Sequence, residues 1–325
     1  MLNEINTTKK WKIAIVGAGY MAQEHAKAFA SLPNVQIAGV CGRSLPRAKA
    51  LANTYCVPVF NSVASLYEGT QADVVVIAVK ELSAREVCLA AFSHPTWLCL
   101  LEKPVGVNLH QAQDITSAAL LHGVRAYVAL NRRSYSSTRQ AIQELATDDS
   151  PRLISVLDNQ DLLFARNLGQ PEEVLRNYMY ANSIHLIDYM NLFGRGEILA
   201  VEQTQHWNAE SPGYVVATVH YSQGDIAVYQ AVWNGPGPWS VTVTNSQVRL
   251  EMRPLEKLNI QRLGERRLSE APSDAIDTEF KPGLRYQADQ IIGLLQGQTT
   301  TLATLEEATR SMGLCADIYG LRTKP

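Results

Sequence analysis

The sequence predicts two domains: an α/β domain with a doubly wound parallel sheet, then an α+β domain on an open, mainly antiparallel sheet. In the first third of the chain, short continuous apolar runs alternate with amphipathic stretches. In the second half, strand-like runs follow one another, and several alternate apolar with polar residues. The length of 325 residues agrees with two units, because it exceeds what one hydrophobic core usually serves.

Five apolar runs in the first domain predict buried strands, because helices cover both faces of a parallel sheet. The runs are 12–16, 35–41, 73–79, 97–101 and 125–130, and helices are expected over 20–31, 45–54, 82–92 and 109–122. Alternation of strand and helix with short connections implies right-handed crossovers, and therefore an open doubly wound sheet.

The pattern changes around the polar cluster 148–151, which follows a helix expected over 136–146. Strands are then expected over 153–158, 198–206, 214–221, 226–233, 241–244 and 248–252. Helices are expected near 182–193, 284–295 and 305–319, and a loop over 268–280. We place the domains at 1–130 and 131–325, with the closing helices free to pack back on the first domain.

Charge and cysteine content exclude several classes of protein. Twenty-nine basic and 31 acidic residues give a net charge of -2, so no positive field attracts nucleic acid or a membrane surface. No apolar run approaches the roughly 18 residues of a spanning helix. Residues 1–10 are polar and lack the apolar stretch that a signal peptide needs, so we expect no signal peptide there. The five cysteines form no CxxC pair, so we expect a reduced, cytoplasmic protein with neither disulfides nor a metal site.

A glycine-rich turn follows the first predicted strand directly. Gly17 and Gly19, with Ala22, form a GxGxxA pattern that opens a helix and encloses Tyr20 and Met21. Gly17 permits the tight turn, Gly19 lets the backbone approach a pyrophosphate, and Ala22 allows close packing of helix on strand. The positive end of the helix then holds the diphosphate. This context predicts a dinucleotide site rather than a simple connecting turn.

The end of the second strand indicates which dinucleotide binds. NAD sites usually place an acid there for the adenosine ribose, but this chain has Gly42, followed by Arg43 and Ser44. No carboxylate would repel a 2′-phosphate, which the guanidinium and the hydroxyl can bind. Arg47 is a second candidate cation. We therefore expect NADP, with NAD as the alternative, although Arg43 as an ordinary solvated loop residue is a common outcome.

Five segments in order resemble the glucose-fructose oxidoreductase / inositol dehydrogenase / MocA (Gfo/Idh/MocA) family, over nearly the whole chain. They are KIAIVGAGYMAQEHAKAF from residue 12, Glu102-Lys103-Pro104, Asn131-Arg132-Arg133, Ile184-His185-Leu186-Ile187-Asp188 and Phe280-Lys281-Pro282-Gly283. The resemblance implies a Rossmann domain, then a substrate-binding domain whose sheet forms homodimers or homotetramers.

Two residues are implied to be catalytic. Lys103 follows an apolar strand at the carboxyl edge of the sheet, where open α/β proteins bind ligands, and it can stabilise an alkoxide. The family's helix histidine maps to His185, a general acid/base, which Asp188 three residues later could orient. Val79 and Glu102, with Lys103, are expected beside the cofactor. Weaker expectations for substrate contacts are Arg133, Tyr180, Asn182 and Asp188.

The chain departs from the family at two places. Many members carry an aspartate four residues before the histidine, where this chain has Ala181. The usual Thr-Pro-Asn after the strand 73–79 is replaced, which leaves Lys80 as an unassigned cation. The resemblance still favours hydride transfer between nicotinamide and a carbinol or carbonyl carbon of a sugar, sugar-nucleotide or polyol-like substrate. The departures support an alternative, a non-catalytic dinucleotide-binding sensor or regulatory protein.

Overall fold

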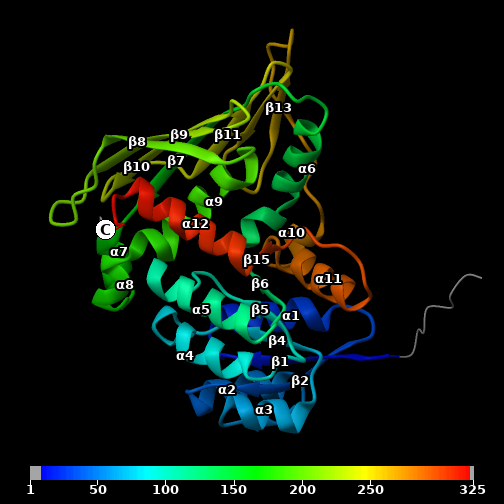
Figure 1. The fold of residues 1–325 in the computed structure, drawn as a ribbon. Coiled ribbons are helices and arrows are strands. Elements are labelled where there is room, and N and C mark those ends of the chain that lie inside the picture. Colours follow the sequence, from blue (N-terminus) through cyan, green and yellow to red (C-terminus); the bar gives the residue numbers. More distant parts are fainter. Residues whose placement is uncertain (1–8, 323–325) are drawn as a thin grey trace, which may run out of the picture.

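The computed structural model describes residues 9–322, which form two sheets with helices around and between them (Figure 1). Residues 1–8, part of the segment expected to carry no targeting signal, lie outside the described residues. Among the described residues, no helix is long and apolar enough to cross a membrane.

The first sheet has seven strands in the order β15-β6-β5-β4-β1-β2-β3. Their bounds are β1 Trp11–Val16, β2 Val35–Cys41, β3 Val59–Phe60, β4 Val74–Ile77, β5 Leu98–Leu101, β6 Ala126–Val128 and β15 Ala303–Thr304. All neighbours are parallel except β15, which runs antiparallel to β6. The predicted doubly wound Rossmann sheet is confirmed, and the strand order reverses beside β1.

Side chains of β1 alternate between two cores, one on each face of the sheet. Ile13 and Ile15 pack with the side of the sheet covered by α1 and α2, whereas Ala14 and Val16 face α3, α4 and α5. These helices are α1 Tyr20–Ala30, α2 Leu45–Thr54, α3 Val63–Thr70, α4 Glu81–Phe92 and α5 Leu109–Leu121. The apolar strand runs therefore reflect burial on both faces.

Two elements of this domain were missing from the sequence prediction. β3 has only two residues, too few for a periodic pattern. Helix α3 is eight residues long, and it begins at a capping box in which Ser62 and Ser65 satisfy each other's backbone N–H groups. That box was a readable signal, because two serines three residues apart precede an apolar segment.

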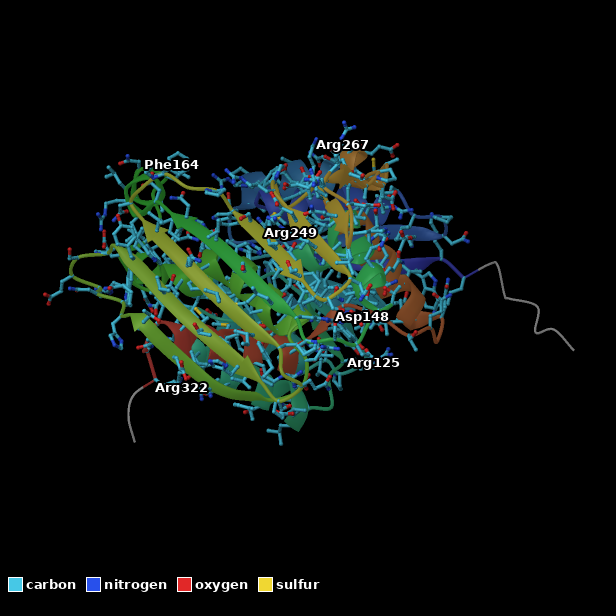
Figure 2. All side chains as sticks on the ribbon, turned by 90° about the horizontal axis from the view of Figure 1, so that it is seen from above. Arg125, Asp148, Phe164, Arg249, Arg267 and Arg322 are labelled. Carbon is cyan, nitrogen blue, oxygen red and sulfur yellow. The ribbon has the colours of Figure 1, made fainter. Side chains whose placement is uncertain are left out.

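The second sheet has eight strands in the order β14-β13-β12-β11-β7-β10-β9-β8. Their bounds are β7 Leu153–Gln160, β8 Ile198–Gln205, β9 Tyr214–Tyr221, β10 Ile226–Trp233, β11 Ser240–Thr244, β12 Val248–Met252, β13 Asn259–Arg262 and β14 Ser269–Glu270. Neighbours are antiparallel except β7 and β10. Alternate residues of β7, β9 and β10 are buried. Figure 2 looks onto the other, open face of this sheet.

Helices of the second half lie mainly under this sheet, toward the first domain (Figure 1). They are the 3₁₀ turn Asn131–Ser134, α6 Ser136–Leu145, α7 Leu162–Asn167, α8 Glu172–Arg176, the π-helical turn Met179–Ser183, α9 Ile184–Phe193, α10 Ile276–Glu279, α11 Leu284–Leu295 and α12 Leu305–Ile318. The loop expected over 268–280 is wrong in part, because β14 and α10 interrupt it. Both closing helices return to the first domain, α11 against α1 and α12 against α5.

A buried ion pair joins three of these elements. Arg133 donates from Nε and Nη2 to the two carboxylate oxygens of Asp188 on α9, at 2.7 and 2.8 Å. Ser311 of α12 donates to the same carboxylate at 2.7 Å, and Glu307 accepts from Arg133 Nη1 at 3.1 Å. The Arg133 and Asp188 side chains are only 10% and 4% exposed. The pair therefore fixes the position of the 3₁₀ turn against α9 and α12.

We expect Arg133→Met to lower the free energy of unfolding by about 3–5 kcal/mol, because it leaves the Asp188 carboxylate buried without its cation. Urea unfolding followed by circular dichroism measures the change. The matched control is Lys257→Met, which removes an exposed ion pair with Glu270 and should cost no more than about 1 kcal/mol. Equal losses in the two variants would contradict the structural role of Arg133.

Candidate functional site

The glycine turn joins β1 to α1 at the carboxyl edge of the first sheet. Gly17 has a φ of +120°, which favours glycine, and a Cβ there would collide with the carbonyl oxygen of Ala78. Gly19 is extended, and among the described residues a Cβ there would meet no atom within 4 Å. No side chain of the described residues caps the first turn of α1. The turn thus presents backbone N–H groups to open space, as a diphosphate site requires.

A cavity of about 620 Å³ lies beside this turn. Of the predicted cofactor residues, those that line it are Gly17, Gly19, Gly42, Arg43, Ser44 and Val79. Arg47 and Lys80 line it too. Tyr20, Met21, Glu102 and Lys103 are not among the lining residues. The volume lies within the ~300–1,000 Å³ of typical small-molecule sites, and the lining fits the adenosine diphosphate portion of a dinucleotide.

At the end of β2, small residues surround Gly42. A Cβ on Gly42 would lie 3.4 Å from the Cβ atoms of both Ala18 and Ala48, so a larger side chain would crowd the turn. Ser44 precedes α2 without capping it, which leaves its hydroxyl available to a ligand. The lining of the cavity thus carries three cations, Arg43, Arg47 and Lys80, against the single acid Glu86.

The Glu102 side chain makes a contact that the sequence analysis did not foresee. Its Oε1 lies 2.7 Å from Nε2 of His25 on α1, and the two side chains are 9% and 1% exposed. This pair ties the segment after β5 to the helix that begins at the glycine turn. The signal was available, since His25 belongs to the segment that carried the family resemblance.

Lys103 connects the first sheet to the helix layer of the second domain. Its Nζ donates to the backbone carbonyl of Ala181 at 2.7 Å. Burial and, to a smaller extent, the positive charge of Arg132 lower the pKa of Lys103 to about 8. Ala181 occupies the position of the family's aspartate, so the lysine meets a backbone oxygen there instead of a carboxylate.

Ala181 lies in the π-helical turn that precedes α9, and π-helical turns occur frequently at functional sites. One helical turn later, His185 is 3% exposed, and its Nε2 lies 2.8 Å from Nη1 of Arg132. A guanidinium only donates, so Nε2 accepts and the ring proton is on Nδ1, which is buried without a partner among the described residues. Lys103 and His185 therefore approach the same turn.

The charged side chains that shift the pKa of His185 are cations. Burial lowers the pKa of His185 well below its usual value, and Arg132, Lys103 and Lys281 lower it further. The imidazole is therefore neutral at physiological pH and able to accept a proton. Lys103, in contrast, changes its protonation state near pH 8.

Asp188 does not orient His185, contrary to the expectation from their spacing. The buried ion pair with Arg133 takes both carboxylate oxygens of Asp188. The guanidinium of Arg133, which was expected to contact the substrate, is bound by Asp188 and Glu307 instead. The helix spacing of three residues was right, but the neighbouring 3₁₀ turn supplied a stronger partner.

The other two predicted substrate contacts face different surroundings. Tyr180 is 3% exposed; burial raises the pKa of its hydroxyl, as do Cys315 and Asp317 near the end of α12. Asn182 donates to Oε1 of Gln160 on β7 at 2.8 Å. Tyr180 is thus a packing residue of the α12 layer, and the substrate role of Asn182 stays a prediction.

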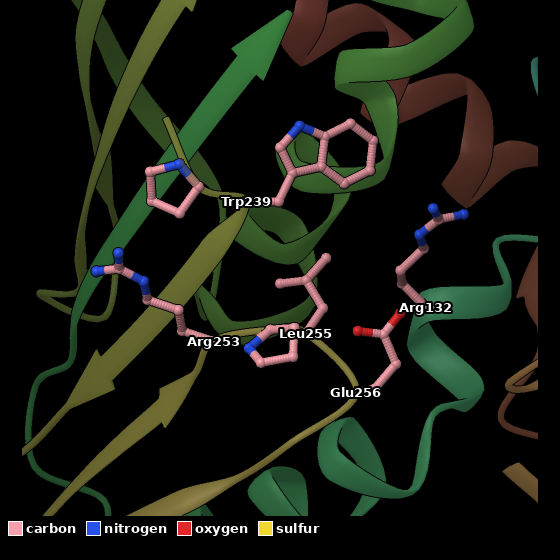
Figure 3. Close-up of a pocket in the computed structure, with 7 residues that line it drawn as sticks. Arg132, Trp239, Arg253, Leu255 and Glu256 are labelled. Atoms are coloured by element: carbon pink, nitrogen blue, oxygen red, sulfur yellow. The ribbon is translucent and has the colours of Figure 1, made fainter. Parts of the chain in front are cut away.

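A smaller cavity of about 270 Å³ lies between the 3₁₀ turn and the loops around β11 and β12 (Figure 3). Its lining residues are Arg132, Pro238, Trp239, Arg253, Pro254, Leu255 and Glu256. His185 does not line it, but two of its lining residues, Arg132 and Trp239, neighbour the His185 ring. The Arg132 guanidinium lies over the Trp239 ring at 5.5 Å. Arg132 was named in a motif without a role, because nothing in the sequence alone places it beside Trp239.

Residues 11–130 match the model of the oxidoreductase family with an NAD-binding Rossmann fold. A curated relative, glucose-6-phosphate 3-dehydrogenase of Bacillus subtilis (strain 168), is 29% identical over 126 residues, which are 38% of this chain and 35% of that protein. The matched segment thus spans about a third of the curated relative, and it corresponds to the first domain.

Solved structures extend the likeness to the whole chain. UDP-N-acetylglucosamine 3-dehydrogenase from Acidithiobacillus ferrooxidans has a TM-score of 0.77 at 16% identity, with 95% of this chain and 96% of that chain covered. A dehydrogenase from Chromobacterium violaceum has a TM-score of 0.80 at 19% identity, with 96% and 95% covered. At such identities the likeness concerns the fold. The first domain thus matches the Gfo/Idh/MocA family of oxidoreductases, and the whole chain shares the fold of the solved dehydrogenases.

Proposed function

We propose that this protein is an NADP-dependent oxidoreductase that acts on CH–OH groups of a sugar, sugar-nucleotide or polyol-like substrate. One observation carries the proposal: Lys103, at the carboxyl edge of the first sheet, donates to the turn that leads into His185. An ammonium that can donate a proton and an imidazole that can accept one thus converge beside the dinucleotide edge, as oxidation of a carbinol requires.

The cofactor residues divide by the part of the dinucleotide they would hold. The turn at Gly17 and Gly19 would bind the diphosphate, and Arg43 and Ser44 the 2′-phosphate, while Val79 lines the same cavity. Glu102 contributes indirectly, through its bond to His25. When bound, the nicotinamide ring supplies the acceptor or donor of the hydride.

Lys103 and His185 would share the proton chemistry at the substrate oxygen. With a pKa of about 8, the Lys103 ammonium donates a hydrogen bond to that oxygen and stabilises the negative charge that develops there. The neutral His185 imidazole receives the hydroxyl proton during oxidation. The buried setting keeps water from competing for either proton.

A non-catalytic dinucleotide sensor is the alternative, and one observation favours it. Arg132 donates to Nε2 of His185, and Ala181 brings no carboxylate to Lys103. Both features would suit a site that binds nucleotide without turnover. Measured turnover decides between the two functions.

We further propose that residues 1–130 bind the dinucleotide and that 131–325 hold the substrate and form a homodimer or homotetramer through the open face of the second sheet. The carbohydrate class of substrate is supported by the relative named glucose-6-phosphate 3-dehydrogenase. All five cysteines are free, which agrees with a reducing compartment, and we propose the cytoplasm.

Lys103→Met and His185→Ala should each lower kcat at least about 100-fold while leaving NADPH affinity within about twofold, because general acid–base groups typically contribute about 10²–10⁴-fold. Reduced-nicotinamide absorbance, measured with a panel of sugars and sugar nucleotides, follows turnover, and calorimetry follows NADPH binding. Arg310→Met, on the exposed side of α12, is the control. Unchanged kcat in both variants would contradict the catalytic assignment, and absence of turnover in the unmodified protein would favour the sensor.

Gly19→Ala should fold normally yet lose most of its NADPH affinity, because its Cβ meets nothing in the protein but points to the place proposed for the pyrophosphate. Gly17→Ala should instead unfold at a lower temperature, since its backbone conformation and the Ala78 carbonyl both exclude a Cβ. Thermal unfolding with and without NADPH separates these effects. Normal NADPH binding by Gly19→Ala would contradict a diphosphate at this turn.

Arg43→Ala should weaken NADPH binding by about tenfold or more and leave NADH binding nearly unchanged, because only NADPH carries the 2′-phosphate that the guanidinium would bind. The dissociation constants of both nucleotides are measured for the two proteins. An initial preference for NADH, or an equal loss for both nucleotides, would contradict the NADP assignment.

A further inference from the structure

The small cavity lined by Arg132 and Trp239 (Figure 3) contains a cation with unused hydrogen-bonding capacity, and the same cation contacts His185. We propose that this cavity receives an anionic group of the substrate, a carboxylate or phosphate on a monosaccharide, and that Arg132 is the specificity residue that binds it. This inference rests on the proposed oxidoreductase function and names its substrate class.

Positive charge dominates the surroundings of His185. Arg132, Lys103 and Lys281 all act on the His185 ring, and no acid does so to a comparable degree. The acids that act on Lys103 are Glu102, which His25 holds, and Glu81. The cavity itself is lined by two cations, Arg132 and Arg253, against one acid, Glu256. The charge around it therefore stays positive, and an anionic substrate would balance that charge better than a neutral one.

Arg132 has hydrogen-bond donors that the described residues leave unused. Its Nη1 donates to Oδ1 of Asn131 at 2.9 Å and to Nε2 of His185 at 2.8 Å. Its Nε is buried without a partner among the described residues. Carboxylates and phosphates accept two parallel hydrogen bonds from a guanidinium, which single hydroxyls cannot do. The neighbouring Arg133, by contrast, already has two carboxylates and no such capacity.

The size and the apolar lining of the cavity suit a single sugar ring. Trp239 donates from Nε1 to the carbonyl of Asn159 at 2.8 Å, which fixes the indole beside Arg132. Leu255 adds an apolar surface across the cavity, so the lining offers a sugar ring two apolar faces. In Figure 3 the Arg132 guanidinium points toward the Trp239 side and away from the Glu256 carboxylate. The volume of about 270 Å³ suits one sugar ring with its charged group rather than a whole sugar nucleotide.

Anion binding would also prepare His185 for proton transfer. At present, Arg132 takes the Nε2 lone pair that a substrate hydroxyl would need. A substrate anion that draws the guanidinium toward itself releases Nε2. Arg132 then couples recognition of the anion to the availability of the base, so neutral sugars would be poor substrates even where they fit the cavity.

The test uses dead-end complexes, in which NADPH-saturated protein binds the alcohol form of a sugar without reaction. The panel is glucose, galactose and mannose, each with its uronate and its 6-phosphate, and calorimetry gives each dissociation constant. At least one anionic member should bind about tenfold or more tightly than its neutral parent. Comparison of uronate with phosphate identifies which anion the cavity takes.

Arg132→Met should abolish this advantage, Arg132→Lys should keep part of it, and Lys281→Met should reduce it less. Arg310→Met, which is 71% exposed, should keep it in full. NADPH affinity, measured for every variant, verifies folding. In turnover assays, Arg132→Met should also shift the pH profile upward, because removal of its charge raises the pKa of both Lys103 and His185.

Equal binding of neutral and anionic sugars, binding by no member of the panel, or an undiminished advantage in Arg132→Met would each overturn the inference. Failure of the oxidoreductase function has a different signature: Arg132-dependent binding of anions without turnover when NADP⁺ replaces NADPH. Turnover of neutral sugars that is indifferent to Arg132 would support the oxidoreductase and overturn the anion site.

Discussion

The hydrogen bond from Lys103 to the carbonyl of Ala181 is the contact on which the site depends. It joins the carboxyl edge of the parallel sheet to the π-helical turn that leads into α9. Burial removes water from the ammonium and so disfavours its charged form, and the nearby charge of Arg132 adds to this effect. The pKa of Lys103 therefore falls to about 8. The same burial leaves the lysine able to give up a proton at moderate pH. Position and chemistry thus follow from one interaction.

Two adjacent arginines have opposite environments. Arg133 is held by Asp188 and Glu307, so it serves packing, and its charge is compensated within the protein. Arg132 has an amide oxygen, an imidazole and an indole face as neighbours, none of which neutralises it. The 3₁₀ turn that carries both residues therefore points one cation into the helix layer and the other toward the cavity. A half-buried cation without a bound carboxylate is favourable to keep where a ligand anion can pair with it.

Much of the fold could be predicted because its signals are local. Buried parallel strands have no polar face, and the glycine turn needs particular residues, so β1, β2, β4 and the Gly17 turn were recognised. Short elements such as β3 and β14 lack a periodic pattern and are fixed by pairing with distant strands. The predicted loop over 268–280 failed for that reason.

Only those site residues that belong to a short sequence motif could be predicted. Lys103 and His185 were singled out through motifs, and they do approach one turn. The partners of their neighbours depended on tertiary contacts: His25 with Glu102 spans 77 positions, and Arg133 with Asp188 spans 55. Spacing along a helix indicated Asp188 for His185, but a guanidinium from another element outcompeted the imidazole for that carboxylate.

A crystal structure of the protein with bound NADP⁺ tests the central claim most directly. The account predicts a diphosphate at the Gly17–Gly19 turn and a nicotinamide ring whose C4 faces a space bordered by both Lys103 Nζ and His185. A ring bound elsewhere, or Lys103 and His185 on opposite sides of it with no space shared between them, would contradict the account.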